Sequence, residues 1–399
     1  MEYQDKISVL QTEVKEELSS NILPYWNKLT DTENGGFYGR VDAQNMLHKH
    51  ADKGGILHAR ILWTFSAAYR ILRDEAYLQT ARIAKQYLID KFIDKEYGGT
   101  FWKLDYQGNP VDDKKQIYNL AFSIYGLSEF YRATADITAL ETAIQLFHLI
   151  EKHSFDMVNN GYFEAFTRNW HTIDDMRLSE KDANEKKTMN THLHVLEAYT
   201  NLYRVWKLPE LKMQLINLVE IFMTKIIDLK TNHLTLFFDE IWNPKSNTFS
   251  YGHDIEAAWL IKEAAVVSED KNLLQSVNNF ICPLVDAALE AYQAEQGLAY
   301  EFDPLSNYTD NERHWWVQAE AIVGALEAFR VSNDEKYLSV ALSTWQYIKQ
   351  YLIDKEHGEW YWSRLENGSS STNEDKAGFW KCPYHNGRMC MELMKFEIK

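Results

Sequence analysis

A short pattern that recurs six times along the 399-residue chain constrains the fold more strongly than any other feature of the sequence. Each copy has a small turn followed by aromatic or other apolar residues, as in NGGFYGR, YGGTFWK, NGYFEAF, NHLTLFF, QGLAYEF and HGEWYWS. The aligned positions are Gly36, Gly99, Gly161, His233, Gly297 and Gly358, which lie 63, 62, 72, 64 and 61 residues apart. A nearly constant period of this length indicates a series of repeated supersecondary units.

Each unit contains two predicted helices of different character. A hairpin and a polar loop lead into an apolar stretch such as ILHARILWTFSAAYRIL, which is hydrophobic nearly all round and predicts a buried helix. A more amphipathic stretch follows, with an apolar stripe at helical spacing, for example Tyr77, Ala81, Ala84 and Leu88. The buried helices are predicted to begin near Ile56, Tyr118, Thr191, His253, Arg313 and Tyr384, and the half-exposed helices near Asp5, Asp74, Asp136, Pro209, Asp270 and Asp334.

Six such pairs predict an all-α protein, an (α/α)6 barrel of six inner and six outer helices with short β-hairpins in the loops. An open superhelical stack is the alternative arrangement of the same pairs. Closure is favoured because the first unit begins with an outer helix, the last ends with an inner one, and neither end carries an extra polar cap. The length alone suggests more than one domain. No Pro/Gly/Ser-rich linker breaks the period, however, so residues 1–399 are predicted to form a single catalytic domain.

The net charge and the cysteines limit the partners and the compartment. The formal net charge is −16, and a chain this acidic repels nucleic-acid backbones and anionic membrane surfaces. The three cysteines, Cys282, Cys382 and Cys390, cannot all pair and do not have metal-ligand spacing. The first residues lack the apolar core of a signal peptide, and no apolar run long enough to span a membrane follows. We therefore expect a cytoplasmic protein that binds neither nucleic acid nor a membrane. We also expect a monomer or weak dimer.

The candidate site lies where the inner helices begin. If the units repeat faithfully, all inner helices run the same way and their N-terminal ends share one face of the barrel. The residues predicted to meet there are Arg60, Tyr118, Asn190, His194, His253, Glu256, Trp316, Glu320, Trp380 and His385. Several of them are three or four residues apart and so lie on one side of their helix. Such a face offers histidines, an arginine, carboxylates and indoles, which together suit a neutral sugar.

Other chemistries find little support in the sequence. His192 and His194 of THLH are two residues apart and so point to different faces of a helix, although His253 and Glu256 have the spacing to chelate a metal. An HExxH motif, Gly-rich phosphate loops and a GxSxG elbow are all absent from the sequence. We therefore expect neither a metal ion nor an organic cofactor.

Strings along the whole chain resemble those of the acylglucosamine 2-epimerase superfamily, and within it most closely the cellobiose 2-epimerases. The strings are ENGGFYGRVD, ARILWTFS, AFSIYGLSE, KTMNTHLHVLE, SYGHDIEAAWL, HWWVQAEA and KCPYHNGRM. THLH is similar to the cellobiose branch rather than to the N-acetylglucosamine branch. The sequence departs from that branch at Asn119 and Leu120, where the cellobiose enzymes more often have a Gln. The resemblance implies an (α/α)6 barrel that interconverts glucose and mannose at a reducing end, at C2, without an organic cofactor.

The resemblance also implies a role for each candidate residue. His253 and His385 are expected to be the acid/base pair, Arg60 to stabilise the enediolate, and His194 to assist ring opening or orient the sugar. The residues expected to hold the reducing sugar are Tyr118, Asn190, Glu256, Trp316 and Glu320. Asp182 and Trp380 are expected to flank that sugar or the next one along the substrate.

These residue types suit proton transfer at carbon. Histidine is a base near neutral pH, and an arginine keeps its charge beside a developing enediolate oxygen. The predicted reaction is conversion of cellobiose to glucosyl-mannose at the reducing end through a cis-enediolate; epimerisation of free mannose and glucose is the alternative. A glycosidase using Glu256 and Glu320, or a non-catalytic sugar-binding protein, are less favoured readings.

Overall fold

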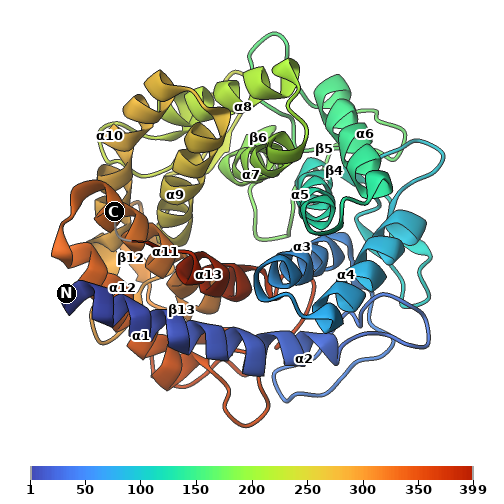
Figure 1. Ribbon diagram of the computed structural model, residues 1–399. Helices are drawn as coiled ribbons and strands as arrows, with labels where there is room; N and C mark the ends of the chain where they lie inside the picture. Colours follow the sequence, from blue (N-terminus) through green and yellow to red (C-terminus); the bar gives the residue numbers. More distant parts are fainter. Residues whose placement is uncertain (1, 398–399) are drawn as a thin grey trace.

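The computed structural model, which describes residues 2–397, shows two concentric rings of helices (Figure 1). The inner ring consists of α3 (Gly55–Leu72), α5 (Ile117–Thr134), α7 (Met189–Val205), α9 (Tyr251–Ser268), α11 (Trp315–Ser332) and α13 (Tyr384–Met394). The outer ring consists of α1 (Glu2–Glu16), continued by η1 (Glu17–Ile22) and α2 (Leu23–Asn27), and of α4 (Glu75–Tyr87), α6 (Ile137–His153), α8 (Pro209–Ile221), α10 (Lys271–Ala288) and α12 (Glu335–Tyr347). The predicted (α/α)6 barrel is confirmed, and each inner helix begins within two residues of its predicted start.

The ring is closed by the two ends of the chain. The first outer helix, α1, packs against the last inner helix, α13, and α13 also packs against α3 and α11 (Figure 1). The open superhelix is therefore excluded. No helix in the described range 2–397 is both long and apolar enough to cross a lipid bilayer.

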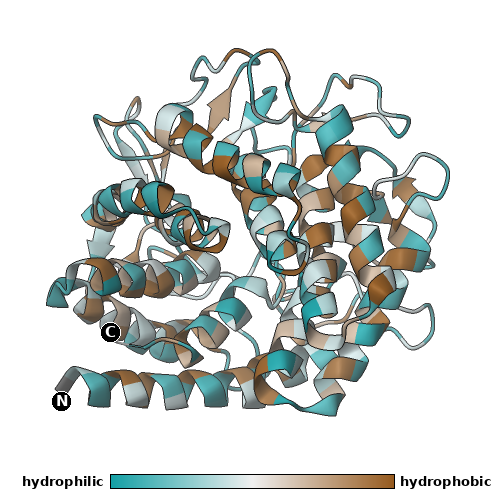
Figure 2. Ribbon diagram, turned by 45° about the horizontal axis from the view of Figure 1, so that its top comes forward, coloured by the Kyte–Doolittle hydropathy of each residue, from teal (hydrophilic) through white to brown (hydrophobic). Residues whose placement is uncertain are grey.

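The outer helices are stabilised at their N-terminal ends by capping residues, and each packs by one apolar side against the inner ring. Asp74, Asp136, Asp270 and Asp334 each accept a hydrogen bond from a backbone amide in the first turn of the helix that follows. Hydrophobic and hydrophilic segments alternate along the helices in Figure 2, as expected for helices with one buried side. Leu338, Ala341 and Trp345 of α12 and Ile348, directly after its end, form such a stripe and are all buried.

Short antiparallel strands join consecutive units beside the starts of the inner helices. The sheets are β1 (Lys53–Gly54) with β2 (Lys103–Leu104) and β3 (Pro110–Asp112), β4 (Lys115–Gln116) with β5 (Ala165–Phe166), β6 (Lys187–Thr188) with β7 (Phe237–Phe238), β8 (Phe249–Ser250) with β11 (Glu301–Asp303) and β12 (Tyr308–Asp310), β9 (Tyr292–Gln293) with β10 (Gly297–Leu298), and β13 (Arg313–His314) with β14 (Ser363–Arg364). Strands β1, β4, β6, β8 and β13 lead directly into an inner helix and pair with a strand of the next unit. This pairing fixes the N-terminal ends of neighbouring inner helices relative to one another.

Buried ion pairs secure three of these junctions. The first residue of each of β1, β4 and β6 is a lysine that forms an ion pair with the aspartate at the start of the preceding hairpin turn. The pairs are Lys53–Asp31 at 2.7 Å, Lys115–Asp94 at 2.8 Å and Lys187–Asp156 at 2.7 Å. The same aspartates accept backbone amides two and three residues further on. A turn and a helix start are thus tied together in each of these units.

A carboxylate between the two rings gives the fold a pH-dependent stability. Glu151 of α6 accepts hydrogen bonds from the hydroxyls of Tyr162, at 2.8 Å, and of Tyr199 in α7, at 2.6 Å. Burial outweighs these bonds and raises the pKa of Glu151 from 4.5 to about 7. A group whose pKa is raised on folding stabilises the fold at low pH and loses that contribution as pH rises through the folded value.

We therefore expect Glu151→Gln, which keeps an acceptor oxygen for both tyrosines, to become progressively more stable than the wild type as pH rises. The difference in free energy of unfolding should grow by roughly 2–3 kcal/mol between about pH 5 and about pH 8. Urea denaturation of both proteins at the two pH values measures it. A difference that does not change with pH would contradict the assignment.

Candidate active site

Arg60 lies among aromatic rings at the N-terminal half of α3. Its guanidinium donates a hydrogen bond to the Tyr118 hydroxyl of α5 at 2.8 Å. It also lies over the rings of Phe122 and Tyr384, at 4.1 and 4.8 Å from their centroids. The Nε atom of Arg60 is buried and has no hydrogen-bond partner in the described part of the chain. One donor of a permanently charged group is therefore free for another acceptor.

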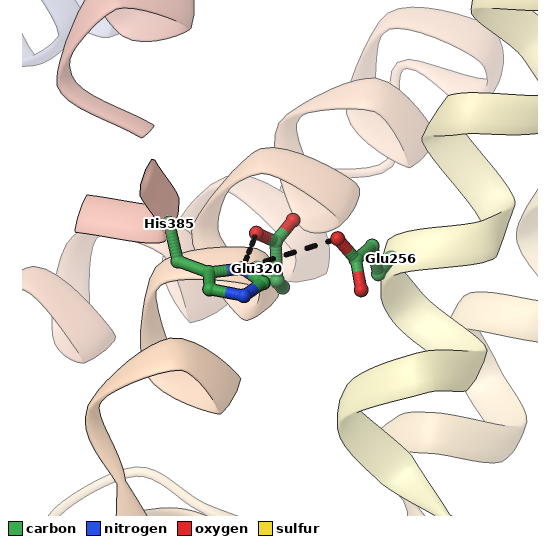
Figure 3. A group of neighbouring side chains, drawn as sticks. All are labelled: Glu256, Glu320 and His385. Carbon is green, nitrogen blue, oxygen red and sulfur yellow. Dashed lines mark hydrogen bonds and ion pairs between the residues drawn. The ribbon is translucent and has the colours of Figure 1, made fainter. Parts of the chain in front are cut away.

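His385 is fixed by two carboxylates of neighbouring helices (Figure 3). Its Nδ1 is 2.7 Å from Glu320 of α11 and 3.9 Å from Glu256 of α9. Both carboxylates also bind the Arg388 guanidinium, Glu256 at 2.5 Å and Glu320 at 2.6 Å, and Glu320 accepts the Trp259 indole N–H at 2.9 Å. With Nδ1 bonded to Glu320, the Nε2 atom of His385 is the one left for substrate.

Arg388 was not among the predicted residues, although it connects most of the site. Its guanidinium also bonds Glu197 of α7 and the Tyr384 hydroxyl. Three carboxylates from three different helices thus converge on one buried cation. Arg388 and His194 outweigh burial at Glu197, whereas burial still raises the pKa of Glu320 and raises that of Glu256 to about 8. A sequence signal was present, since Arg388 follows His385 by three residues and so lies on the same side of α13.

His194 belongs to the same network. Its Nδ1 is 2.9 Å from Glu197, three residues further along α7. Burial alone would raise the pKa of Glu197, but Arg388 and His194 outweigh it and lower the value to about 2. The His194 ring also meets those of Tyr118 and Phe122, at 5.0 and 4.6 Å between centroids. His194 therefore adjoins the Arg60 side of the cluster, as predicted.

His253, at the start of α9, has a different environment. Its Nδ1 is 2.8 Å from the Ser250 hydroxyl, a partner that the sequence analysis missed, and its ring contacts Trp316 at 4.8 Å. The His385 ring contacts the same indole at 5.5 Å. Burial lowers the pKa of His253 to about 3 and holds the pKa of His385 well below its ordinary value. Both imidazoles are therefore neutral near physiological pH, as a base must be.

The remaining predicted residues lie around this cluster. Trp380 is half-buried and meets Trp102 and Tyr118, at 6.0 and 6.2 Å between ring centroids. Asn190 is half-buried, and its Oδ1 has no hydrogen-bond partner in the region described. Asp182 lies in the loop between β5 and β6, where it accepts hydrogen bonds from the backbone amide and hydroxyl of Ser179. Burial is the largest cause of the raised pKa of Tyr300, to which the charge of Asp182 also contributes, and the Tyr300 ring lies 6.3 Å from that of Trp316.

His192 has a structural role. Its Nδ1 lies 2.6 Å from the Thr188 carbonyl, and its Nε2 accepts the Tyr162 backbone amide at 2.9 Å. It holds the hairpin of its own unit, whereas His194 takes part in the cluster.

Glu256, Glu320 and His385 present ligand atoms within 4.8 Å of one another. The Arg388 guanidinium binds both carboxylates, so the cation among them belongs to the chain.

Comparison with known proteins places this site in a family. The N-acylglucosamine 2-epimerase (GlcNAc 2-epimerase) profile matches residues 36–387. The chain is 54% identical over 387 residues to a cellobiose 2-epimerase of Bacteroides fragilis, covering 97% of this chain and 99% of that protein. It is 44% identical to a cellobiose 2-epimerase of Ruminococcus albus, covering 96% and 98%. The cellobiose 2-epimerase structure from Bacillus thermoamylovorans superposes with a TM-score of 0.92 at 44% identity, covering 97% and 99%.

The barrel and its histidine cluster, taken with these similarities, define an isomerase that acts on carbohydrate, a sugar epimerase. The chain belongs to the N-acylglucosamine 2-epimerase family, and the resemblance found in its sequence is confirmed.

Proposed function

We propose that this protein is a 2-epimerase that interconverts glucose and mannose residues at the reducing end of β-1,4-linked disaccharides, converting cellobiose to glucosyl-mannose. The observation that carries the proposal is the pair of histidines, His253 and His385, in contact with one indole, Trp316. The full-length similarity to cellobiose 2-epimerases supports the disaccharide as substrate.

In this proposal the two histidines act on C2 of the open-chain sugar. One neutral imidazole removes the C2 proton through its Nε2. The other first takes a proton from solvent and, as the imidazolium, returns it to the opposite face of the planar cis-enediolate, so the configuration inverts and the first imidazolium releases its proton to solvent. Both Nδ1 atoms are bonded away from the substrate, to Ser250 and to Glu320. The Nδ1 partners differ in kind, a hydroxyl for His253 and a carboxylate for His385, although burial lowers the pKa of both imidazoles.

Arg60 and its neighbours complete the chemistry. The negative charge of the intermediate develops on the oxygens at C1 and C2, and a fixed guanidinium stabilises it there. We assign this role to Arg60, and ring opening or sugar orientation to His194. The predicted contacts of Tyr118, Asn190, Glu256, Trp316 and Glu320 with the reducing sugar, and of Asp182 and Trp380 with that sugar or the next, stay proposals. We place Glu320 as the residue that orients His385.

Two alternative functions, a glycosidase and a free-sugar 2-epimerase, can be distinguished from this proposal. A glycosidase needs two carboxylates that flank the scissile bond, but Glu256 and Glu320 are both held on the Arg388 guanidinium. A free-sugar 2-epimerase would use the same histidines and differ only in the substrate that fits.

We further propose that the protein works in the cytoplasm, in keeping with its three unpaired cysteines. We also propose that it is a monomer or weak dimer and needs neither a metal nor an organic cofactor.

The test is product analysis with cellobiose, mannobiose, lactose, mannose and N-acetylglucosamine. We expect 2-epimers of the disaccharides as the main products. Shortened sugars would establish a glycosidase, turnover of mannose alone would establish the free-sugar enzyme, and no product from any of them would refute the proposal.

Trp380 offers a prediction about substrate length. If its indole stacks on the sugar beyond the reducing end, Trp380→Ala should lose on the order of 1–3 kcal/mol of binding for disaccharides and much less for monosaccharides. This corresponds to a fall of about 5- to 150-fold in kcat/KM with cellobiose. Comparing kcat/KM for cellobiose and mannose measures it, and equal losses on the two would place Trp380 at the reducing sugar.

A further inference from the structure

The unit that carries His253 departs from its neighbours at the repeat position itself. In three other units, the backbone amide after the repeat glycine donates to a long neutral side chain in the first turn of the inner helix. The bonds are Phe37 to His58 at 3.1 Å, Tyr162 to His192 at 2.9 Å and Leu298 to Gln318 at 2.8 Å. In the fourth unit the amide of Leu234 donates to the Asp254 carboxylate at 2.8 Å, and His233 replaces the glycine.

The larger residue on the hairpin, His233 in place of glycine, is matched by a shorter residue on the helix, Asp254 in place of histidine or glutamine. A Cβ on Gly36, Gly161 or Gly297 would lie only 2.9, 2.8 or 2.4 Å from the side chain of His58, His192 or Gln318. The helix side chain is thus one of several reasons for glycine on these hairpins, since Tyr87 and Trp242 come still closer to Gly36 and Gly161 and all three glycines have a positive φ. Asp254 is shorter, and the space it leaves is filled by the imidazole of His233. The substitution adds a polar contact between hairpin and helix that the other three units lack.

His233 is held from several directions. Its Nδ1 lies 2.7 Å from Asp254 Oδ2, and its ring stacks on Phe249 with centroids 3.9 Å apart and an interplanar angle of 11°. Its Nε2 lies 3.5 Å from Glu290, and the ring of Tyr251 lies 5.9 Å away. Burial alone would lower the pKa of His233, but Asp254 and Glu290 outweigh burial and raise it. The ring is thus fixed by a stack on one face and by carboxylates at both nitrogens.

These contacts bracket the segment that presents His253. Phe249 and Ser250 form β8, which runs directly into α9, and Ser250 holds Nδ1 of His253. His233 therefore touches the residue before Ser250 and the residue after His253. It joins the strand and the first helical turn on either side of the Ser250–His253 bond.

We infer that His233 is a positioning residue for His253: by joining Phe249 to Asp254 it keeps the Ser250–His253 segment in the one conformation that directs Nε2 of His253 at the substrate carbon. The inference rests on the proposed role of His253. A positioning role predicts a loss in kcat rather than in KM, because the sugar contacts lie elsewhere and only the alignment of the base changes. Misplacement of a reacting group by about 1 Å can cost on the order of 10²-fold in rate.

The test measures kcat, KM and melting temperature for three variants, with cellobiose or whichever sugar of the panel is turned over. We expect His233→Ala to lower kcat about 10- to 100-fold and to leave KM within about twofold. His233→Asn places an amide N–H near the position of Nδ1, so it should keep kcat within about threefold. Leu215→Ala, at a buried position of outer helix α8, is the matched control and should lower the melting temperature without lowering kcat of the folded protein.

The outcomes separate this inference from the proposed function. A kcat for His233→Ala within twofold of wild type, alongside an inactive His253→Ala, overturns the positioning role and leaves the proposed function standing. Near-normal kcat in His253→Ala removes the role of His253 on which the inference rests, whereas the absence of any epimer from the wild type removes the proposed function itself. If His233→Ala does not fold, Phe249→Leu replaces it, since this variant removes the stacked ring and keeps every hydrogen bond of His233. A lower kcat at unchanged KM then supports the inference, and an unchanged kcat overturns it.

Discussion

His253→Ala and His385→Ala will each lower kcat by roughly 10²- to 10⁴-fold, the loss typical of a missing general acid or base. Substrate binding should change little, because the indoles and the hydroxyl-binding groups remain. Initial rates of epimer formation, with KM measured for the same substrate, test this. His148→Ala is the matched control, since this histidine lies exposed on outer helix α6 and should leave kcat unchanged.

The fate of hydrogen at C2 shows whether these losses reflect proton transfer. In D2O, the wild-type product should carry deuterium at C2 and at no other carbon, because the proton removed by an imidazole exchanges with solvent before another is returned. Ring opening moves hydroxyl protons only and labels no carbon. A variant that no longer epimerises but still introduces deuterium at C2 of unreacted substrate would identify the surviving histidine as the base for that sugar. An unlabelled product, together with near-normal activity in both variants, would refute the two-histidine assignment.

The repeat in the sequence predicted the fold well because each copy marks the same physical junction. Three of the aligned glycines, Gly36, Gly161 and Gly297, lie where hairpin backbone approaches the first turn of an inner helix, as Gly161 does at His192. Gly99 and Gly358 lie nearest to Trp170 and Asn21 instead, so the period reflects the hairpin turn that each copy marks. The fourth unit has His233 where the other five have glycine. The contact between His233 and Asp254, which the sequence did not reveal, explains this exception. That residues 1–399 form a single domain stays a prediction.

The site was predicted less completely than the fold. Residues at helix starts were found, since their place follows from the period. Arg388 was missed because its importance comes from Glu197, Glu256 and Glu320, which lie on three other helices and are brought together only by closure of the ring. For the same reason the sequence favoured Glu256 and Glu320 as sugar ligands and did not reveal that both carboxylates are bonded to Arg388 and approach His385. Ser250 was missed because a serine before a helix ordinarily indicates a cap.

Arg60→Met is expected to have the second large effect, a fall of about 10²- to 10³-fold in kcat, the cost typical of removing one oxyanion donor. The side chain is replaced by one of similar reach, so the stacking beside Phe122 is partly kept while the charge is lost. Because the charge matters more in the enediolate than in the neutral sugar, kcat should fall much more than KM rises.

The same variant should also shift the pH profile, which separates loss of charge from loss of packing. Arg60 is one of the cations that, after burial, hold the pKa of His385 below its ordinary value. Removing that charge must raise the pKa of His385, so the acid limb of kcat/KM, where the base becomes protonated, should move to higher pH. Arg60→Lys keeps the charge and loses the planar fork, so its limb should stay closer to that of the wild type although its kcat falls. A kcat for Arg60→Met within tenfold of wild type, with the acid limb unmoved, would show that Arg60 acts on neither the intermediate nor His385.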